Sequence, residues 1–307
     1  MNKHTIILLL LISSVSIYSQ AWVNQTVTPP PPPLYSVSAY SNNIAWASGD
    51  DGTVLFTSNG GANWVYRGSS FFILNTVYSV HALDPVTAVC ICNISGAGKI
   101  FKTTNQGGSW FQVFSRNGLY LNDIEFVSST TGFAYGDPYQ GRWFVMKTTN
   151  GGASFDTTLT RPLSPTGLEI GFPNALHLFQ ASVGGLISIW FTSDISRIYH
   201  STNSGVAWDT NDFTPGNLEN YAVTFINANT GFASGNLPFM TTNGGNTWIV
   251  QPNYPNFGIF YSFANTAGKV WYSSGPGICV STNNGVNFIP QYTNPQLEVY
   301  RHMSFVT

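Results

Sequence analysis

Charged side chains are scarce in this chain. Its 307 residues include 11 Lys or Arg and 13 Asp or Glu, 8% in all, and the formal net charge is −2. A nucleic-acid backbone is bound by clustered Lys and Arg, so we expect no nucleic-acid partner. The hydrophobic fraction of 43% can bury a large core, which excludes a disordered chain.

Cysteine is also rare, with three residues. Cys90 and Cys92 stand two apart in a segment typical of a strand, so they share a face and a bridge between them would be strained. We expect buried free cysteines, and a disulfide from Cys90 or Cys92 to Cys279 is the alternative. No Cys/His spacing resembles a zinc site. We expect neither a metal nor a cofactor.

Long hydrophobic runs are absent. The apolar run Ile6–Ile12 is too short to cross a bilayer, which takes about 18 residues, and no later segment reaches that length. Lys3 and His4 precede this run and small polar residues follow it, as in a secretory signal. We expect a signal peptide at 1–20, a single domain at 21–307, and a secreted or cell-surface protein without a transmembrane segment.

The informative feature is a repeat. The pattern [Ser/Thr]-x-Asn-x-Gly-x-x-[Trp/Phe] occurs six times, with its first positions 40 to 53 residues apart. The repeated asparagines are Asn59, Asn105, Asn150, Asn203, Asn243 and Asn283. An Asn side chain can bond the backbone two residues on and Gly accepts a positive φ, so each copy predicts a tight hairpin turn with a structural role.

Short strand-like segments surround each turn. Two of them precede it, as Ala45–Gly49 and Thr53–Phe56 do in the first copy. An alternating segment opens the unit, and the Trp or Phe starts a fourth strand. Four antiparallel strands in about 45 residues, without helical periodicity, are typical of a propeller blade. We therefore predict an all-β fold, a β-propeller with six complete blades.

The turn resembles the Asp-box (BNR) repeat of sialidase-like propellers, with Asn in place of the usual Asp in all six copies. The longer pattern, Gly231-Phe232-Ala233-Ser234-Gly235 followed by Thr241–Trp248, is similar to secreted relatives of the photosystem-II assembly factor found in bacteria of the Bacteroidetes type. The resemblance covers about residues 22 to 307. It implies a propeller, and it implies export through the type IX system in many relatives, but no particular activity.

The two ends of the chain are expected to form a partial seventh blade. Trp22–Thr26 is typical of an outer strand, and Val299–Val306 is typical of the inner strand of a next blade. Either these two segments close the ring or the natural chain continues beyond Thr307. We favour truncation, because the type IX sorting domain that the resemblance implies is also missing.

Long segments predict where a ligand binds. The expected loops are 136–143, 156–173, 184–195 and 209–220, all on the face opposite the repeat turns. Function on a propeller concentrates where long loops converge. The candidate ligand-binding residues in or beside these loops are Arg116, Asp137, Tyr139, Arg142, Trp143, Arg161 and Arg197. Arginines, a carboxylate and flat rings suit a glycan or an extracellular protein; the alternative is that these groups are structural, with Arg142 neutralising Asp137.

Catalysis is the second hypothesis. Asp137 and Glu169 are the candidate pair of carboxylates for a glycoside hydrolase. A sialidase, by resemblance, needs an early Arg-Ile-Pro element, whereas the first arginine here is Arg67. No nucleophile-elbow motif supports a serine hydrolase. The sequence thus predicts an exported binding or scaffold module, with a hydrolase as the alternative.

Overall fold

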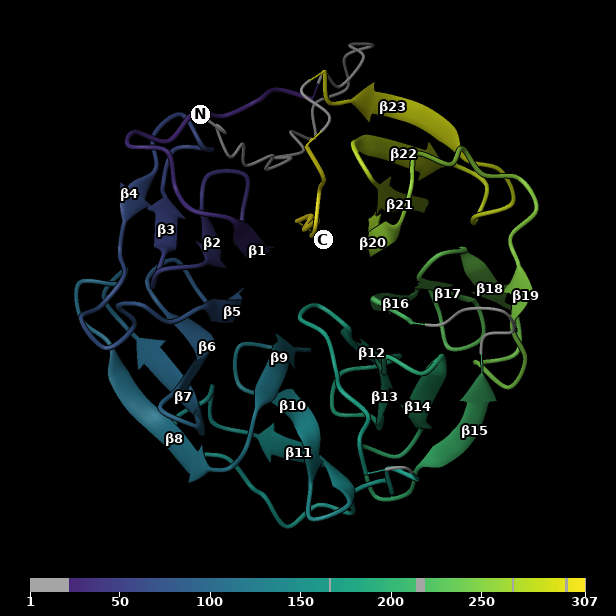
Figure 1. Cartoon of the computed structure of the whole chain (residues 1–307), viewed down its shortest axis with the longest axis horizontal. Coiled ribbons are helices and arrows are strands. Elements are labelled where there is room, and N and C mark those ends of the chain that lie inside the picture. Colours follow the sequence, from purple (N-terminus) through teal and green to yellow (C-terminus); the bar gives the residue numbers. More distant parts are fainter. Residues whose placement is uncertain (1–21, 166, 214–218, 267, 296–297, 307) are drawn as a thin grey trace.

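The computed structural model describes residues 22–165, 167–213, 219–266, 268–295 and 298–306. Within these ranges the chain contains strands and loops and no helix, and hence no helix that could span a membrane. The strands form six antiparallel sheets, which are arranged radially around a central axis (Figure 1). The predicted propeller is confirmed. The predicted signal peptide at 1–20 lies outside the described residues.

Each sheet is one blade, and its strands run outward in chain order. The first two blades are β1 (Leu34–Ala39), β2 (Ala45–Gly49), β3 (Val54–Thr57), β4 (Val65–Tyr66), and β5 (Val77–Ala82), β6 (Ala88–Ile94), β7 (Ala97–Thr103), β8 (Phe111–Asn117). Blades three and four are β9 (Leu121–Phe126), β10 (Gly132–Tyr139), β11 (Arg142–Thr148), and β12 (Leu176–Gln180), β13 (Ile187–Thr192), β14 (Arg197–Ser201), β15 (Asp209–Phe213). The last two are β16 (Ala222–Phe225), β17 (Gly231–Ser234), β18 (Phe239–Thr241), β19 (Ile249–Val250), and β20 (Phe260–Thr266), β21 (Lys269–Ser274), β22 (Gly277–Ser281), β23 (Ile289–Thr293).

The third blade departs from the four-stranded plan. In place of a fourth strand, the chain after the repeat turn runs beside β11 and makes two isolated bridges, Lys147 with Asp156 and Arg142 with Leu163. The backbone N–H of Trp143 donates to the carbonyl of Pro162 at 3.0 Å. These contacts hold the segment 156–163 against the outer edge of the blade.

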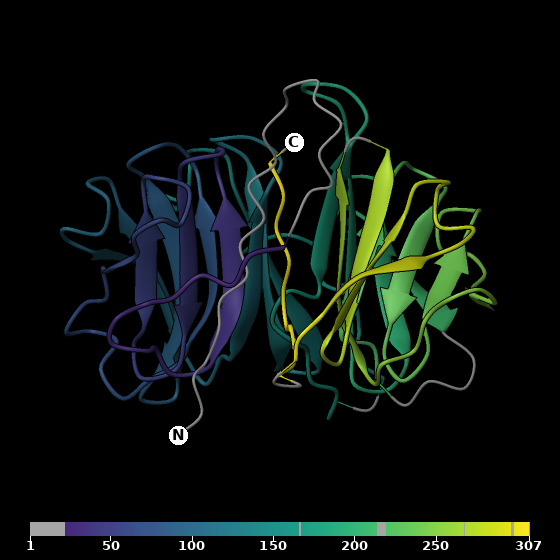
Figure 2. The ribbon, with the colours of Figure 1, turned by 90° about the horizontal axis from the view of Figure 1, so that it is seen from above.

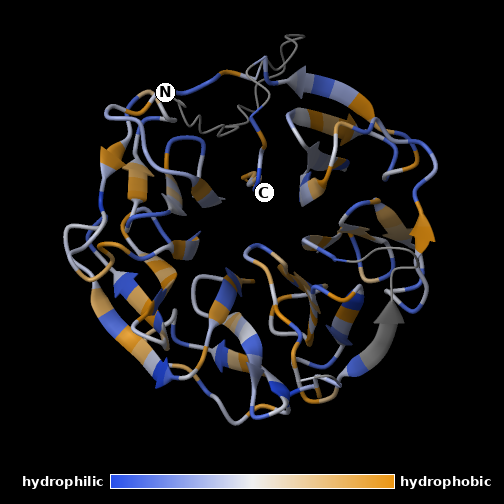
Figure 3. Cartoon of the chain, viewed as in Figure 1, coloured by the Kyte–Doolittle hydropathy of each residue, from blue (hydrophilic) through white to orange (hydrophobic). Residues whose placement is uncertain are grey.

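Apolar side chains seal each blade to the next. The second strand of a blade, such as β2, is buried along its whole length because neighbouring blades cover both faces of the sheet. Trp46 and Phe56 of the first blade meet Phe72 and Trp110 of the second in one cluster, with ring centroids 4.7 to 5.9 Å apart. Some of the exposed apolar side chains, such as Ile249 of β19 and Ile289 of β23, lie on outermost strands, and others lie in loops and turns. Figure 3 shows the outer strand β19 coloured as hydrophobic.

The two ends of the chain fill the gap between the last blade and the first (Figures 1 and 2). Tyr300, Met303 and Phe305 join a cluster with Trp271 of β21, and the Trp22 ring packs edge-on against Trp271 with centroids 5.7 Å apart. Neither described end forms a regular strand. The partial seventh blade therefore consists of two segments held by side-chain contacts and by a backbone hydrogen bond of 3.3 Å from the N–H of Tyr300 to the carbonyl of Gly275.

The six repeat turns share one hydrogen-bond pattern. In the first, the Thr57 hydroxyl donates to Asn59 Oδ1 and accepts from the backbone N–H of Gly61, both at 3.0 Å. Asn59 Oδ1 also accepts from the backbone N–H of Asn63 at 2.9 Å. The other five turns repeat these three bonds within 2.8–3.0 Å. Each asparagine side chain thus stabilises its own turn.

The anchoring tryptophans occupy related places. Trp110 Nε1 donates to the carbonyl of Arg67 in the preceding blade, and Trp208 Nε1 to that of Thr160, at 2.8 and 2.9 Å. Trp64 Nε1 donates to Gln25 Oε1 at 2.9 Å, so the N-terminal segment takes the place of a preceding outer strand. Trp248 is as buried as Trp64 but has no hydrogen-bond partner for its Nε1.

All three cysteines are free and buried, as expected. Cys90 and Cys92 belong to β6, inside the apolar cluster between the first and second blades. Burial raises the pKa of Cys92 to about 12 and that of Cys279 to about 11, and it raises the pKa of Cys90 well above its usual range. These thiols act as small apolar core residues.

Candidate functional site

The inner strands all start at one end of the central channel. The turns between second and third strands lie at the same end, and we call this side the axial face; the repeat turns lie at the opposite end. Three loop predictions were wrong in part. The loop expected at 136–143 is a two-residue turn between β10 and β11. Residues 187–192 form β13 and 209–213 form β15, and the turn 181–186 lies on the repeat-turn face, where the backbone N–H of Ser204 donates to the carbonyl of Ile187. β13, a short and largely buried strand, was mistaken for part of a loop, and so was β15, which carries Asp209 and Asp212.

Three arginines gather on the outer rim of the axial face, between the second and third blades. The Arg116 guanidinium, on β8, lies 5.7 Å from the Tyr139 ring and 5.0 Å from the Phe144 ring. Arg161 lies 5.6 Å from the same Phe144 ring. Arg142 Nη1 donates to the backbone carbonyl of Arg161 at 2.7 Å. We call Arg116, Tyr139, Arg142 and Arg161 the rim cluster.

Local backbone geometry builds this cluster. Tyr139 and Arg142 are paired at the end of the β10–β11 hairpin, and both residues between them, Gln140 and Gly141, have positive φ, as in a type I′ turn. Opposite β11, the backbone N–H of Ser164 donates to the carbonyl of Gly141 at 3.1 Å. The turn and the flanking segment therefore hold Arg142 beside Arg161.

The rim cluster has no internal counter-charge. Among the described residues Arg197 pairs with Glu169, and His177 lies 3.9 Å from Glu125 as a neutral ring; neither contact includes Arg116, Arg142 or Arg161. Arg161 Nη1 is also buried, and no described residue forms a hydrogen bond with it. Positive charges gathered without a carboxylate favour an anionic ligand, and planar guanidinium groups suit carboxylates in particular.

Asp137 lies two residues before Tyr139 on β10, and its side chain forms hydrogen bonds within the fold. Its Oδ1 accepts from Asn122 Nδ2 at 2.7 Å and from the backbone N–H of Gly171 at 2.8 Å. Burial raises its pKa, and the two hydrogen bonds oppose that rise. The expectation that Arg142 neutralises Asp137 was wrong, because Arg142 bonds the Arg161 carbonyl instead.

Three other predicted residues, Trp143, Glu169 and Arg197, have structural contacts. The Trp143 ring is fully buried against Tyr135, Phe191 and Tyr199, so it cannot stack on a ligand. Glu169 is also buried; its Oε1 lies 3.5 Å from Arg197 Nε, and its Oε2 accepts from the Tyr199 hydroxyl at 2.7 Å. Strand alternation after the turn directs Trp143 inward, whereas the sequence only placed it near a loop.

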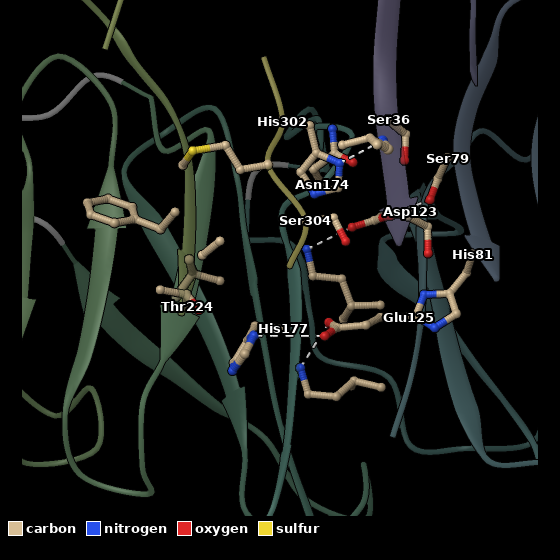
Figure 4. A pocket seen from close by; sticks show the side chains of 18 of the residues that line it. Ser36, Ser79, His81, Asp123, Glu125, Asn174, His177, Thr224, His302 and Ser304 are labelled. Carbon is tan, nitrogen blue, oxygen red and sulfur yellow. Dashed lines mark hydrogen bonds and ion pairs between the residues drawn. The ribbon is translucent and has the colours of Figure 1, made fainter. Parts of the chain in front are cut away.

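The second polar site, which the sequence analysis missed, is the central channel. Its cavity of about 350 Å³ is lined by the inner strands and the C-terminal segment (Figure 4). Asp123 Oδ2 and Glu125 Oε2, both on β9, accept from the backbone N–H groups of Leu176 and Leu178 at 3.2 and 3.0 Å. The sequence did contain a sign of this site, because polar residues such as Asp123 and Glu125 alternate along the first strand of a blade.

The same bonding links other inner strands. Ser36 and Ser38 accept from Val80 and Ala82 of the next blade at 3.3 and 3.1 Å. Ser262 Oγ accepts from the backbone N–H of Met303 at 3.2 Å. Side-chain oxygens of one inner segment thus accept hydrogen bonds from the unpaired backbone N–H groups at the edge of the next. This explains why the channel contains polar residues.

Buried titratable groups in the channel have shifted pKa values. Burial raises the pKa of Asp123 to about 6 against the hydrogen bonds it accepts, and raises that of Glu125 well above its usual range. Burial lowers the pKa of His177 to about 4. Within the described part of the chain no group of three or more His, Cys, Asp or Glu is arranged to hold a metal ion.

Comparisons with known proteins show the fold. No protein-family model and no curated protein matches the chain. Among solved structures, YCF48 bound to a D1 peptide has a TM-score of 0.65 at 14% identity, covering 86% of this chain and 82% of that one. YCF48 from Cyanidioschyzon merolae has a TM-score of 0.59 at 16% identity, covering 88% of both.

Hydrolases with the same fold are also similar. An ancestral GH74 enzyme has a TM-score of 0.61 at 15% identity, covering 90% of this chain and 43% of the enzyme. The GH74 xyloglucanase from Xanthomonas campestris has a TM-score of 0.56 at 11% identity, covering 86% and 46%. The chain thus spans less than half the length of these enzymes. At such identities the likeness establishes a β-propeller and no activity.

Proposed function

We propose that this protein is an exported binding module that holds an acidic peptide segment of an extracellular protein at the rim cluster. The observation that carries the proposal is the gathering of Arg116, Arg142 and Arg161 without a carboxylate partner in the described chain. The aromatic rings beneath Arg116 and Arg161 hold their guanidinium groups in place, which lowers the entropy lost on binding.

Two further points support a peptide. A structure with the same fold, YCF48, was solved with a D1 peptide bound. The sequence resemblance to secreted relatives of the photosystem-II assembly factor favours a binding role too. Export would follow from the signal peptide expected at 1–20, and a secreted protein whose mass corresponds to a start near Gln20 or Ala21 would support that part.

A hydrolase reading has less support in this chain. It needs two carboxylates free to reach a glycosidic bond. Asp137 accepts two hydrogen bonds from the fold, and Glu169 is buried beside Arg197. Neither predicted carboxylate is free for general acid or base work, so we favour binding over turnover.

The test uses a fluorescein-labelled twelve-residue Gly-Ser peptide with three consecutive glutamates and amidated ends, and a control in which glutamines replace the glutamates. Fluorescence anisotropy should show binding of the glutamate peptide alone, weakening as salt rises. Arg142→Ala is the first variant because Arg142 is exposed and holds no ring. We expect at least a tenfold loss of affinity in Arg142→Ala and in Arg116→Ala.

The matched control is Lys269→Ala. It removes the same charge, but Lys269 starts β21 at the repeat-turn end of the sixth blade. Its affinity should equal that of the wild type. Equal binding of the glutamate and glutamine peptides, or equal losses in the Lys269 and Arg142 variants, would overturn the proposal.

A further inference from the structure

A ring of tyrosines surrounds the axial end of the channel. Tyr35, Tyr78 and Tyr261 are each the second residue of an inner strand, and Tyr221 directly precedes β16. The residues that follow Tyr35 and Tyr78, namely Ser36 and Ser79, line the cavity, so the tyrosines stand at its mouth. All four side chains are partly exposed.

In the partial seventh blade, Arg301 of the C-terminal segment occupies the place that Tyr35 has in the first blade. The residue after it, His302, lines the cavity, as Ser36 does after Tyr35. The Arg301 guanidinium lies 5.4 Å from the centre of the Tyr35 ring and 5.6 Å from that of Tyr261. We call Arg301, Tyr35 and Tyr261 the axial cluster.

The guanidinium is exposed and has no ion-pair partner among the residues described. Two acidic residues near the channel mouth hold tyrosine hydroxyl groups. Asp50 accepts from the Thr76 hydroxyl at 2.5 Å and from the Tyr35 hydroxyl at 3.3 Å, and Glu219 accepts from the Tyr221 hydroxyl. Neither forms an ion pair with Arg301, whose guanidinium is supported by two rings as that of Arg116 is at the rim.

A line of aromatic rings leads from the axial cluster toward the rim cluster. Arg301 lies over the Tyr35 ring, which is 6.2 Å from the Tyr78 ring, and the Tyr120 ring is 5.4 Å from that of Tyr78. Tyr120 follows Arg116 of the rim cluster by four positions in the chain, just after β8. We call the rings of Tyr35, Tyr78 and Tyr120, which lie between the two cationic sites, the tyrosine track.

We propose that Arg301 is a second carboxylate-binding site, and that one extended peptide lies along this track with one carboxylate at the rim cluster and another at the axial cluster. The inference rests on the proposed binding of an acidic peptide and adds where its other end is held. Tyrosine rings suit an extended backbone, since they give a large contact area with few torsions to fix. Two linked anchors raise affinity only when their spacing matches the distance between the sites.

The experiment varies that spacing. The labelled peptide with three glutamates serves as the single-anchor probe, and a fourth glutamate is added two, four, six or eight residues away, all with amidated ends. In the wild type one intermediate spacing should bind at least tenfold more tightly than the single-anchor probe. In a further arm, a free C-terminal carboxylate replaces the fourth glutamate, which distinguishes a terminal from a side-chain carboxylate.

Arg301→Ala should remove this gain, so that all spacings bind like the single-anchor probe, while binding of that probe is unchanged. Arg301→Gln, which keeps a hydrogen-bonding side chain of similar length, should do the same, and Lys269→Ala should keep the gain. Thermal melting of each variant checks that the C-terminal segment stays in place.

The outcomes separate the two proposals. If no glutamate peptide binds better than the glutamine control, the proposed function fails. If the single-anchor probe binds but the fourth carboxylate adds nothing at any spacing, or its gain survives Arg301→Ala, the axial site alone is overturned.

Discussion

His302 Nδ1 accepts a hydrogen bond of 3.0 Å from the backbone N–H of Val37, although 265 positions separate the two residues. The bond joins the C-terminal segment to the inner strand of the first blade. Two residues on, Ser304 Oγ accepts from the backbone N–H of Ala39 at 3.1 Å. The C-terminal segment thus closes the ring by the same side-chain bonding that links the other inner strands (Figure 4).

His302→Ala should therefore destabilise the protein by about 1–3 kcal/mol, because it leaves the partly buried N–H of Val37 without an acceptor. Urea unfolding monitored by tryptophan fluorescence measures the loss. His302→Asn is the control, since its Oδ1 can take the place of Nδ1, and it should keep most of the stability. Equal losses in the two variants would show that the hydrogen bond does not hold the ring closed.

The repeat turns could be predicted because their interactions are local. All three bonds of the first turn lie between Thr57 and Asn63, so a short motif contains both donors and acceptors. The blade count followed from the number of motifs. The contact between His302 and Val37 joins residues 265 positions apart, so no short motif contains both. Its role can be recognised only in the closed ring.

The candidate site was predicted in part, for a similar reason. Arg116, Tyr139, Arg142 and Arg161 do come together, because a short hairpin and its flanking segment place them on one edge. Trp143 was predicted wrongly because a single step along β11 reverses the direction of a side chain. Arg301 was missed because its significance depends on rings from the first and last blades.

Asn59→Ala should lower stability by about 1 kcal/mol, because the backbone N–H of Asn63 and the Thr57 hydroxyl lose their shared acceptor. Asn59→Asp should be nearly neutral, since each of these bonds ends on an oxygen that Asp retains. Thermal unfolding of both variants decides the point. A loss in Asn59→Asp as large as that in Asn59→Ala would contradict the role given to Oδ1.

Glu169→Ala should destabilise the fold by roughly 3–5 kcal/mol, the usual consequence of removing one member of a buried ion pair. The Tyr199 hydroxyl would lose its acceptor as well. Glu169→Gln keeps that acceptor and should lose less. Chemical denaturation gives the comparison. A Glu169→Ala variant with wild-type stability that has lost a hydrolytic activity would instead restore the hydrolase hypothesis.

The buried histidines predict that the protein loses stability in mild acid. Burial lowers the pKa values of His81, His177, His200 and His302 to about 4 from a usual 6.5. Between these two values the unfolded chain binds protons that the folded chain does not, so the free energy of unfolding falls as pH falls from 6.5 toward 4.

Three carboxyl groups act in the opposite direction. The raised pKa values of Asp123, Glu125 and Asp137 mean that the folded chain holds protons there which the unfolded chain has released, so their contribution grows as pH falls. Four histidines outnumber these three acids, and the net effect should still be a loss. Urea unfolding at pH 7, 6 and 5 measures it, and a stability that rises toward pH 5 would contradict the balance.

His302→Asn tests the contribution of a single histidine to the pH dependence of stability. It keeps the acceptor for Val37 but cannot take up a proton, so its stability should fall less steeply with acid than that of the wild type. The difference in slope is at most one proton, about 1.4 kcal/mol per pH unit. His81 lies close enough to His302 to lower its pKa further, so removal of the His302 ring also eases protonation of His81 in the folded state. Parallel slopes in the two proteins would show that His302 is not among the groups that acid must protonate to open the ring.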